Sequence, residues 1–93
     1  MKNAEGWKFI QQVQATKGKG YAMFLLDYAG VAIDVVELKR SWHWVKARKL
    51  MKALAHDVAI ICELNQWDAK EATENANKLL SISLAAYPEG GAQ

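Results

Sequence analysis

The sequence contains little of what interrupts or cross-links a polypeptide chain. Among its 93 residues there are one cysteine, Cys62, and one proline, Pro88. A single cysteine excludes an intrachain disulfide and is typical of proteins that stay in the reducing cytosol. Four of the six glycines stand in two short segments, TKGKG and PEGG. Because turn-forming residues are otherwise scarce, the sequence predicts long helices.

A strong excess of one charge and a hydrophobic run of membrane-spanning length are also missing. The formal net charge is +2, which is too small to indicate nucleic-acid binding by itself. The N-terminus has no basic segment followed by an apolar run, so we expect no signal peptide. The most apolar stretch, residues 21–36, is too short to cross a bilayer and contains Asp27 and Asp34. We therefore expect a cytoplasmic protein without a membrane partner.

What the sequence does contain is the composition of a small globular domain, with 52% apolar and 24% charged residues. A first, short helix is expected from Asn3 to about Lys17, because Asn3 can cap it and the KGKG loop can end it. The inward face of this helix would carry Trp7, Phe9, Ile10 and Val13.

The second predicted helix, residues 21–39, is apolar around most of its circumference. At about 100° per residue, its polar positions fall into one narrow stripe of Asp27, Gly30, Asp34 and Glu37. Such a helix must be covered on more than one side, which favours a homo-oligomer. A β-hairpin is the alternative, because DYAG at 27–30 has turn chemistry and VAIDVV is rich in β-branched residues. We prefer the helix because Asp27 and Asp34 align on one face.

The third predicted helix, residues 41–64, is amphipathic. Its apolar face comprises Trp44, Ala47, Leu50, Met51, Leu54, Val58, Ile61 and Cys62. The opposite half carries Lys46, Arg48, Lys49, Lys52 and His56. Because no glycine or proline separates this helix from the second, one continuous bent rod is the alternative to two helices.

A fourth helix begins after Asp68, whose side chain can cap it together with Glu71 three residues later, and Pro88 ends it. Its inner face is expected to comprise Ala69, Ala72, Ala76, Leu79, Leu80, Ser83 and Tyr87. The sequence therefore predicts an all-α fold, a small up-and-down helical bundle of a short N-terminal helix and three longer ones. Residues 1–87 would form a single helical domain, and residues 88–93 a flexible C-terminal tail.

No arrangement of residues typical of an active site or a metal site is recognisable. His56–Asp57 and Cys62–Glu63 are adjacent pairs, and adjacent helical residues point about 100° apart, so neither pair is an obvious chelate. The acids of the second helix are interpreted as a solvated strip rather than an acid–base pair. We expect no enzymatic activity, no metal and no cofactor.

The segment ATKGKGY places Lys17 and Lys19 between glycines just before a predicted helix, where free backbone amides and the helix dipole favour an anion. The pattern G-x-x-x-x-G-K-[ST] of nucleotide-binding loops is absent. We interpret the segment as a flexible connection between helices, and anion binding by Lys17 and Lys19 is the alternative.

The most informative segment is SWHWVKARKLMKALAH, residues 41–56, because no acid occurs between Lys39 and His56. Exposed tryptophan beside arginine and lysine has the composition of a protein–protein hot spot. The predicted partner-binding residues are Arg40, Trp42, Lys46, Lys49, Lys52 and His56. The leading hypothesis is a non-enzymatic helical regulatory protein, a small bacterial or phage-type adaptor or inhibitor, that associates with itself and binds a protein partner. The alternative is a module that binds nucleic acid through the basic helix, residues 39–56, without sequence specificity.

Overall fold

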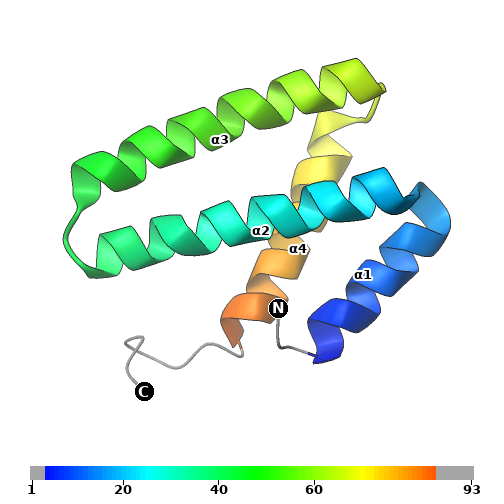
Figure 1. Ribbon diagram of the computed structural model, residues 1–93, viewed down its shortest axis with the longest axis horizontal. Coiled ribbons are helices and arrows are strands. Elements are labelled where there is room, and N and C mark those ends of the chain that lie inside the picture. The colour runs from blue at the N-terminus through cyan, green and yellow to red at the C-terminus, as the bar shows by residue number, and fades with distance from the viewer. Residues whose placement is uncertain (1–3, 86–93) are drawn as a thin grey trace.

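The computed structural model describes residues 4–85, which form four helices (Figure 1). They are α1 (Ala4–Lys17), α2 (Lys19–Arg40), α3 (Trp44–Asn65) and α4 (Ala69–Ala85). No strand occurs in this part of the chain, so the all-α prediction is confirmed and the alternative hairpin at residues 27–30 is wrong. The predicted C-terminal tail and Tyr87 lie outside the described residues.

Helix α2 lies at the centre of the bundle. Figure 1 shows α3 running antiparallel beside α2, α1 packed near the start of α2, and α4 passing obliquely behind it. The predicted polar stripe is confirmed, because Asp27, Gly30, Asp34 and Glu37 are exposed while the apolar residues on the other sides of α2 are buried or half-buried. The chain's own helices cover this apolar surface, so the girth of α2 does not by itself require a second copy.

One buried core joins all four helices. Helix α4 comes close to α2 through Ala72 and Ala76, which are completely buried. The ring of Trp67 packs edge-on against Tyr21, with centroids 4.9 Å apart, and lies 5.6 Å from Phe24. The buried cluster comprises Ile10, Val13, Tyr21, Ala22, Phe24, Leu25, Ala29, Val58, Cys62, Ala72, Ala76 and Leu79.

The inward face of α1 differs from the prediction at one position. Ile10 and Val13 are buried as expected, and Phe9 is half-buried. Trp7, however, is 43% exposed. The buried face is centred on Gly6, Ile10 and Val13, and Trp7 points about 100° away from Gly6 on the helix.

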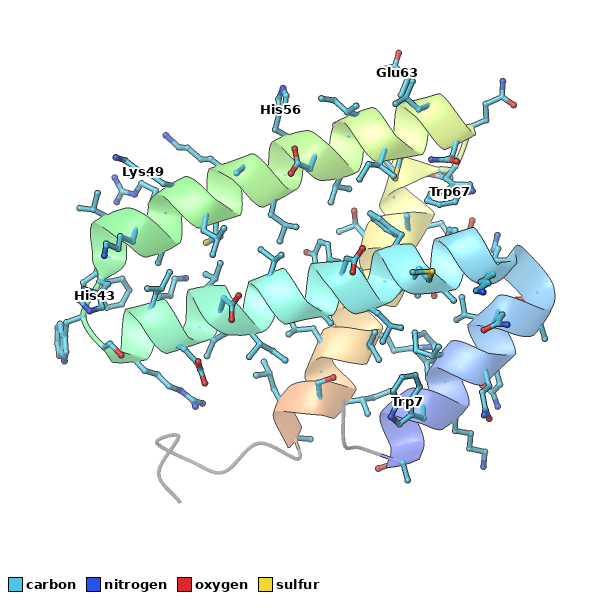
Figure 2. The ribbon with its side chains drawn as sticks, viewed as in Figure 1. Trp7, His43, Lys49, His56, Glu63 and Trp67 are labelled. Carbon is cyan, nitrogen blue, oxygen red and sulfur yellow. The ribbon has the colours of Figure 1, made fainter. Side chains whose placement is uncertain are left out.

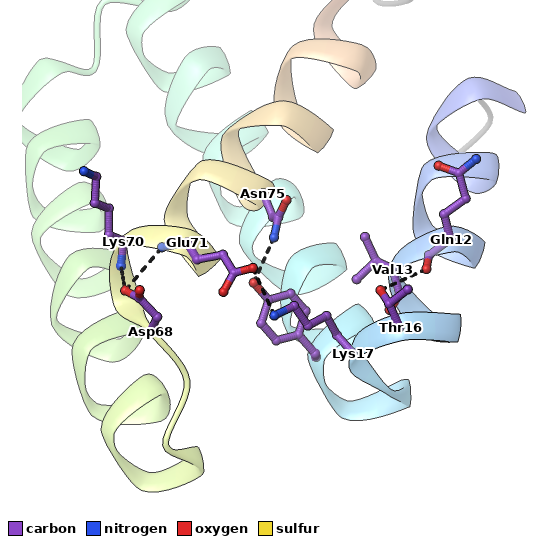
Figure 3. A network of polar contacts seen from close by, with 9 residues as sticks. Gln12, Val13, Thr16, Lys17, Asp68, Lys70, Glu71 and Asn75 are labelled. Atoms are coloured by element: carbon purple, nitrogen blue, oxygen red, sulfur yellow. Dashed lines mark hydrogen bonds and ion pairs between the residues drawn. The ribbon is translucent and has the colours of Figure 1, made fainter.

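Asp68 caps the start of α4 as predicted, whereas the Glu71 carboxylate, expected to take part in the cap, pairs with Lys17 (Figure 3). The Asp68 Oδ1 atom accepts hydrogen bonds from the backbone N–H groups of Lys70, at 2.9 Å, and Glu71, at 3.5 Å. Glu71 forms an ion pair with the Lys17 ammonium group, with an Oε2–Nζ distance of 3.0 Å. One turn later Asn75 donates a hydrogen bond to the Tyr21 hydroxyl at 3.0 Å. The ion pair and the Asn75–Tyr21 hydrogen bond connect the start of α4 to the α1–α2 junction.

The junction between α1 and α2 is a single residue, Gly18, which is shorter than the KGKG loop expected there. Gly18 has φ of 97°, a backbone conformation that side chains with a Cβ rarely adopt. Its N–H donates to the Gln14 carbonyl oxygen at 3.0 Å, and its own carbonyl oxygen accepts from the Ala22 N–H at 3.2 Å. The reversal between α1 and α2 therefore depends on glycine at this position.

Substitution of this glycine gives a first prediction. We expect Gly18→Ala to lower the free energy of unfolding by about 1–2 kcal/mol, because alanine is strained at positive φ. Gly30→Ala is the matched control, because Gly30 is exposed in the middle of α2 and a methyl group added there would meet only open space. That control should raise stability by about 0.5–1 kcal/mol, since alanine favours helix more than glycine does. Urea denaturation followed by circular dichroism measures both, and equal losses would contradict the argument.

Candidate functional site

The C-terminal part of α2 and the first half of α3 extend beyond the other two helices (Figure 1). We call residues 32–55 the arm. Helices α2 and α3 each contain 22 residues, whereas α1 contains 14 and α4 contains 17. The buried residues of the arm, Ala32, Val35 and Ala47, lie outside the core cluster. The arm is therefore a two-helix projection whose outer surfaces the rest of the bundle leaves uncovered.

The end of the arm is a tight turn at residues 41–43, so the alternative of one bent rod is wrong. The His43 N–H donates to the Leu38 carbonyl oxygen at 2.8 Å, and the Trp42 N–H donates to that of Lys39 at 3.1 Å. This pair of hydrogen bonds is the Schellman pattern of helix ends, whose left-handed residue is usually glycine. Trp42 occupies that position with φ of 64°. Neither glycine nor proline marks the break in the sequence.

Trp42 projects from this turn. Its side chain is 78% exposed, and its ring packs edge-on against Trp44 with centroids 6.1 Å apart. The prediction that Trp44 lies in the core is wrong, because Trp44 is 51% exposed. Trp44 lies on the same face of α3 as the buried Cys62, about five turns later, but only the Cys62 end of that face belongs to the core cluster.

The predicted basic residues begin at the end of the arm and continue along α3 to His56, one residue beyond the arm. Figure 2 shows Lys49 and His56 pointing away from α2, and His43 at the turn. All the predicted partner-binding residues are exposed, namely Arg40, Trp42, Lys46, Lys49, Lys52 and His56. The first acid after them is Asp57, whose Oδ1 atom lies 4.0 Å from His56 Nδ1. The structure thus brings the predicted residues together at one end and along one side of the molecule.

A groove with basic residues runs along the start of α3. It has a volume of about 730 Å³ and is lined by Lys39, Trp44, Arg48, Met51, Lys52 and Ala55. Met51, which was expected in the core, is 47% exposed there. Lys39 and Arg48 were not among the predicted partner-binding residues, although the acid-free run that contains them was the signal. We call this the basic groove.

A second groove lies between α2 and α3 and has the opposite charge. Its volume is about 500 Å³, and its apolar lining includes Met23, which is 53% exposed. Asp27 and Asp57 also line it, and no lysine or arginine of residues 4–85 does. The full lining is Gly20, Met23, Phe24, Asp27, Tyr28, Val31, Leu54, Asp57, Val58, Ile61, Asn65 and Trp67. We call this the acidic groove. It could not be recognised from the sequence, because neither helix alone forms it.

The two candidate anion-binding lysines have different surroundings. Lys17 Nζ is paired with Glu71 and lies 5.7 Å from the centroid of the Tyr21 ring. Its hydrogen bond to Glu71 raises the pKa of Lys17, so its positive charge is already directed to a carboxylate of the same chain. Lys19 is exposed in the first turn of α2. The predicted anion site is therefore reduced to one exposed lysine beside an internal ion pair.

The candidates that remain are a metal site, a reactive thiol and a membrane-spanning helix. Within residues 4–85, no three histidine, cysteine or acidic side chains lie close enough together to hold a metal ion. Cys62 is buried, and burial, with a smaller effect of the Asp68 charge, raises the pKa of its thiol. None of the four helices is long and apolar enough to span a bilayer. Comparisons of the chain with protein-family models, curated proteins and solved structures find no match.

The strained position of Trp42 gives a second prediction. We expect Trp42→Gly to leave the free energy of unfolding unchanged or to raise it by up to about 1 kcal/mol. Release of left-handed strain, about 1–2 kcal/mol, offsets the lost Trp42–Trp44 contact, about 0.5–1.5 kcal/mol. Trp67→Ala serves as the contrast, because it removes a ring packed on the core and should cost about 3 kcal/mol. A comparable loss of stability in Trp42→Gly would show that Trp42 serves the fold.

Proposed function

We propose that this chain is a non-enzymatic protein-interaction module of the cytoplasm that regulates a partner by covering part of its surface. Its contact surface is the end and outer side of the arm together with the residue that follows it, and comprises Arg40, Trp42, Lys46, Lys49, Lys52 and His56. The observation that carries the proposal is Trp42, a large apolar side chain that is both strained and exposed.

The strain at Trp42 argues against a purely structural role. A glycine would close the same turn at lower free energy, since it adopts positive φ without a clash. The exposed ring also removes little of its own apolar surface from water within the chain. Residues in sparsely populated backbone conformations cluster at functional sites. Gln66 ends α3 in the same conformation, with φ of 59°, so the distinguishing feature of Trp42 is that its strain is combined with a large exposed apolar ring. Burial of this ring against a partner would remove its apolar surface from water, and the free energy gained would offset the backbone strain at Trp42.

The residues around Trp42 support a protein partner. Tryptophan and arginine are the residues most enriched among interface hot spots, and charged groups usually form the rim around them. Arg40 lies two residues before Trp42, and Lys46 lies four residues after it. Trp42 and Trp44 would form the apolar centre of the contact, and the cations its polar edge.

Affinity capture tests the proposal, which gives a third prediction. The immobilised chain should retain at least one protein from an extract of its source cells, and the Trp42→Ala/Lys46→Glu variant should lose most of it. The control is Leu64→Ala/Lys70→Glu, which also removes one exposed apolar and one exposed basic side chain, away from the arm. Nuclease treatment beforehand removes proteins held through nucleic acid. Identical sets of proteins on all three baits would refute the proposal.

A nucleic-acid-binding module is the second candidate. Lys46, Lys49 and Lys52 are exposed along one straight helix, with no acid between Lys39 and His56. Such a surface can bind a phosphate backbone without reading its sequence. For about five phosphate contacts, the logarithm of the affinity for duplex DNA would fall with the logarithm of salt concentration at a slope of about −4.5. The Lys46→Glu/Lys49→Glu/Lys52→Glu variant would abolish binding, whereas no binding by the unmodified chain at low salt eliminates this candidate.

A further inference from the structure

We propose that one occupant of the contact surface is a second copy of this chain, with Trp42 of one copy docked in the acidic groove of the other. The inference rests on the proposed function, because it uses the same end of the arm. It adds the identity of the partner and the surface of the partner that receives Trp42.

The acidic groove has the chemistry needed to receive an aromatic side chain. Met23 stands half-exposed at its edge, and the rings of Phe24 and Tyr28 contribute to its lining. Methionine and aromatic side chains make favourable contacts with an incoming ring. With a volume of about 500 Å³, the groove is large enough to accept an indole.

Charge makes the two surfaces complementary. Arg40 and Lys46 flank Trp42 along the chain, and Asp27 and Asp57 line the acidic groove. All four side chains are exposed. The contact of Asp57 with His56 is long, at 4.0 Å, so Asp57 retains most of its capacity for a second cation. A cationic end therefore meets an anionic groove when two copies approach, which steers their encounter.

The same molecule cannot make this contact with itself. Asp27 and Arg40 belong to one continuous helix, α2, at positions about 20 Å apart along its axis. Because the helix is straight and rigid over this distance, the turn at residues 41–43 cannot fold back onto the acidic groove of its own chain (Figure 1). Each copy thus presents one projecting end and one groove, and the contact requires two copies.

A charge-exchange experiment tests this. We expect the unmodified chain to associate at tens of micromolar in sedimentation velocity and multi-angle light scattering, and high salt to weaken that association. Arg40→Glu/Lys46→Glu and Asp27→Lys/Asp57→Lys should each be monomeric, since each places like charges at the contact. An equimolar mixture of the two should associate again, because the reversed end of one variant matches the reversed groove of the other. Trp42→Ala should weaken association at least tenfold.

The control for charge is Lys8→Glu/Lys70→Glu, which changes the net charge as much as Arg40→Glu/Lys46→Glu does but leaves both surfaces unaltered. It should associate like the unmodified chain. Circular dichroism verifies folding. If the lysine variant unfolds, Asp27→Asn/Asp57→Asn is tested alone, without the mixing step, and should weaken the association of the otherwise unmodified chain. A strictly monomeric unmodified chain, or a mixture that stays monomeric, overturns the inference. If affinity capture still retains a different protein through Trp42, only this inference fails and the proposed function stands.

Discussion

Coverage of α2 is the constraint on which the rest of the structure depends. Its apolar side chains occupy every side except the stripe of Asp27, Gly30 and Asp34, so neighbours must exclude water from several directions. Helices α1, α3 and α4 do this together. Because α1 and α4 are shorter than α2, and α4 crosses α2 rather than following it, coverage is complete near Tyr21 and ends before Arg40 (Figure 1). The uncovered arm is a consequence of this difference in length.

Polar contacts at the covered end determine how α4 crosses α2. Asn75 donates to the Tyr21 hydroxyl at 3.0 Å, and the Tyr28 hydroxyl donates to Asn77 Oδ1 at 3.2 Å. These bonds, and the exposed Lys17–Glu71 pair, add modestly to stability, since water competes for the same groups. They select one orientation among those that the small faces of Ala72 and Ala76 would permit. The same orientation leaves the far end of α3 without a helix over Trp44.

The four helices could be predicted because periodicity and capping are local properties. Asp68 is the clearest case, because its side chain satisfies two N–H groups of the helix that follows it. The boundary between the second and third helices was predicted at residues 39–41, but one bent rod stayed open as an alternative, since tryptophan stands where glycine normally marks a helix end. The burial of individual apolar residues could not be predicted either. Trp44 and Cys62 share a face of α3, and their different exposure depends on a helix distant in sequence. The exposed cations were predictable from the polar face of α3 alone, whereas both grooves require the placement of two helices.

The separation of charge along α2 and α3 explains why the arm has a free cationic end. The acids of α2 are Asp27, Asp34 and Glu37, and the run of cations without an acid begins at Lys39. A distance of about 20 Å along the helix separates Asp27 from Arg40, which exceeds the Debye length of about 8 Å at physiological ionic strength. The two groups therefore do not neutralise each other within one molecule, and each attracts its complement from solution. The net charge of +2 does not reveal this separation of charge, because a net charge contains no information about where each positive or negative group lies along the arm.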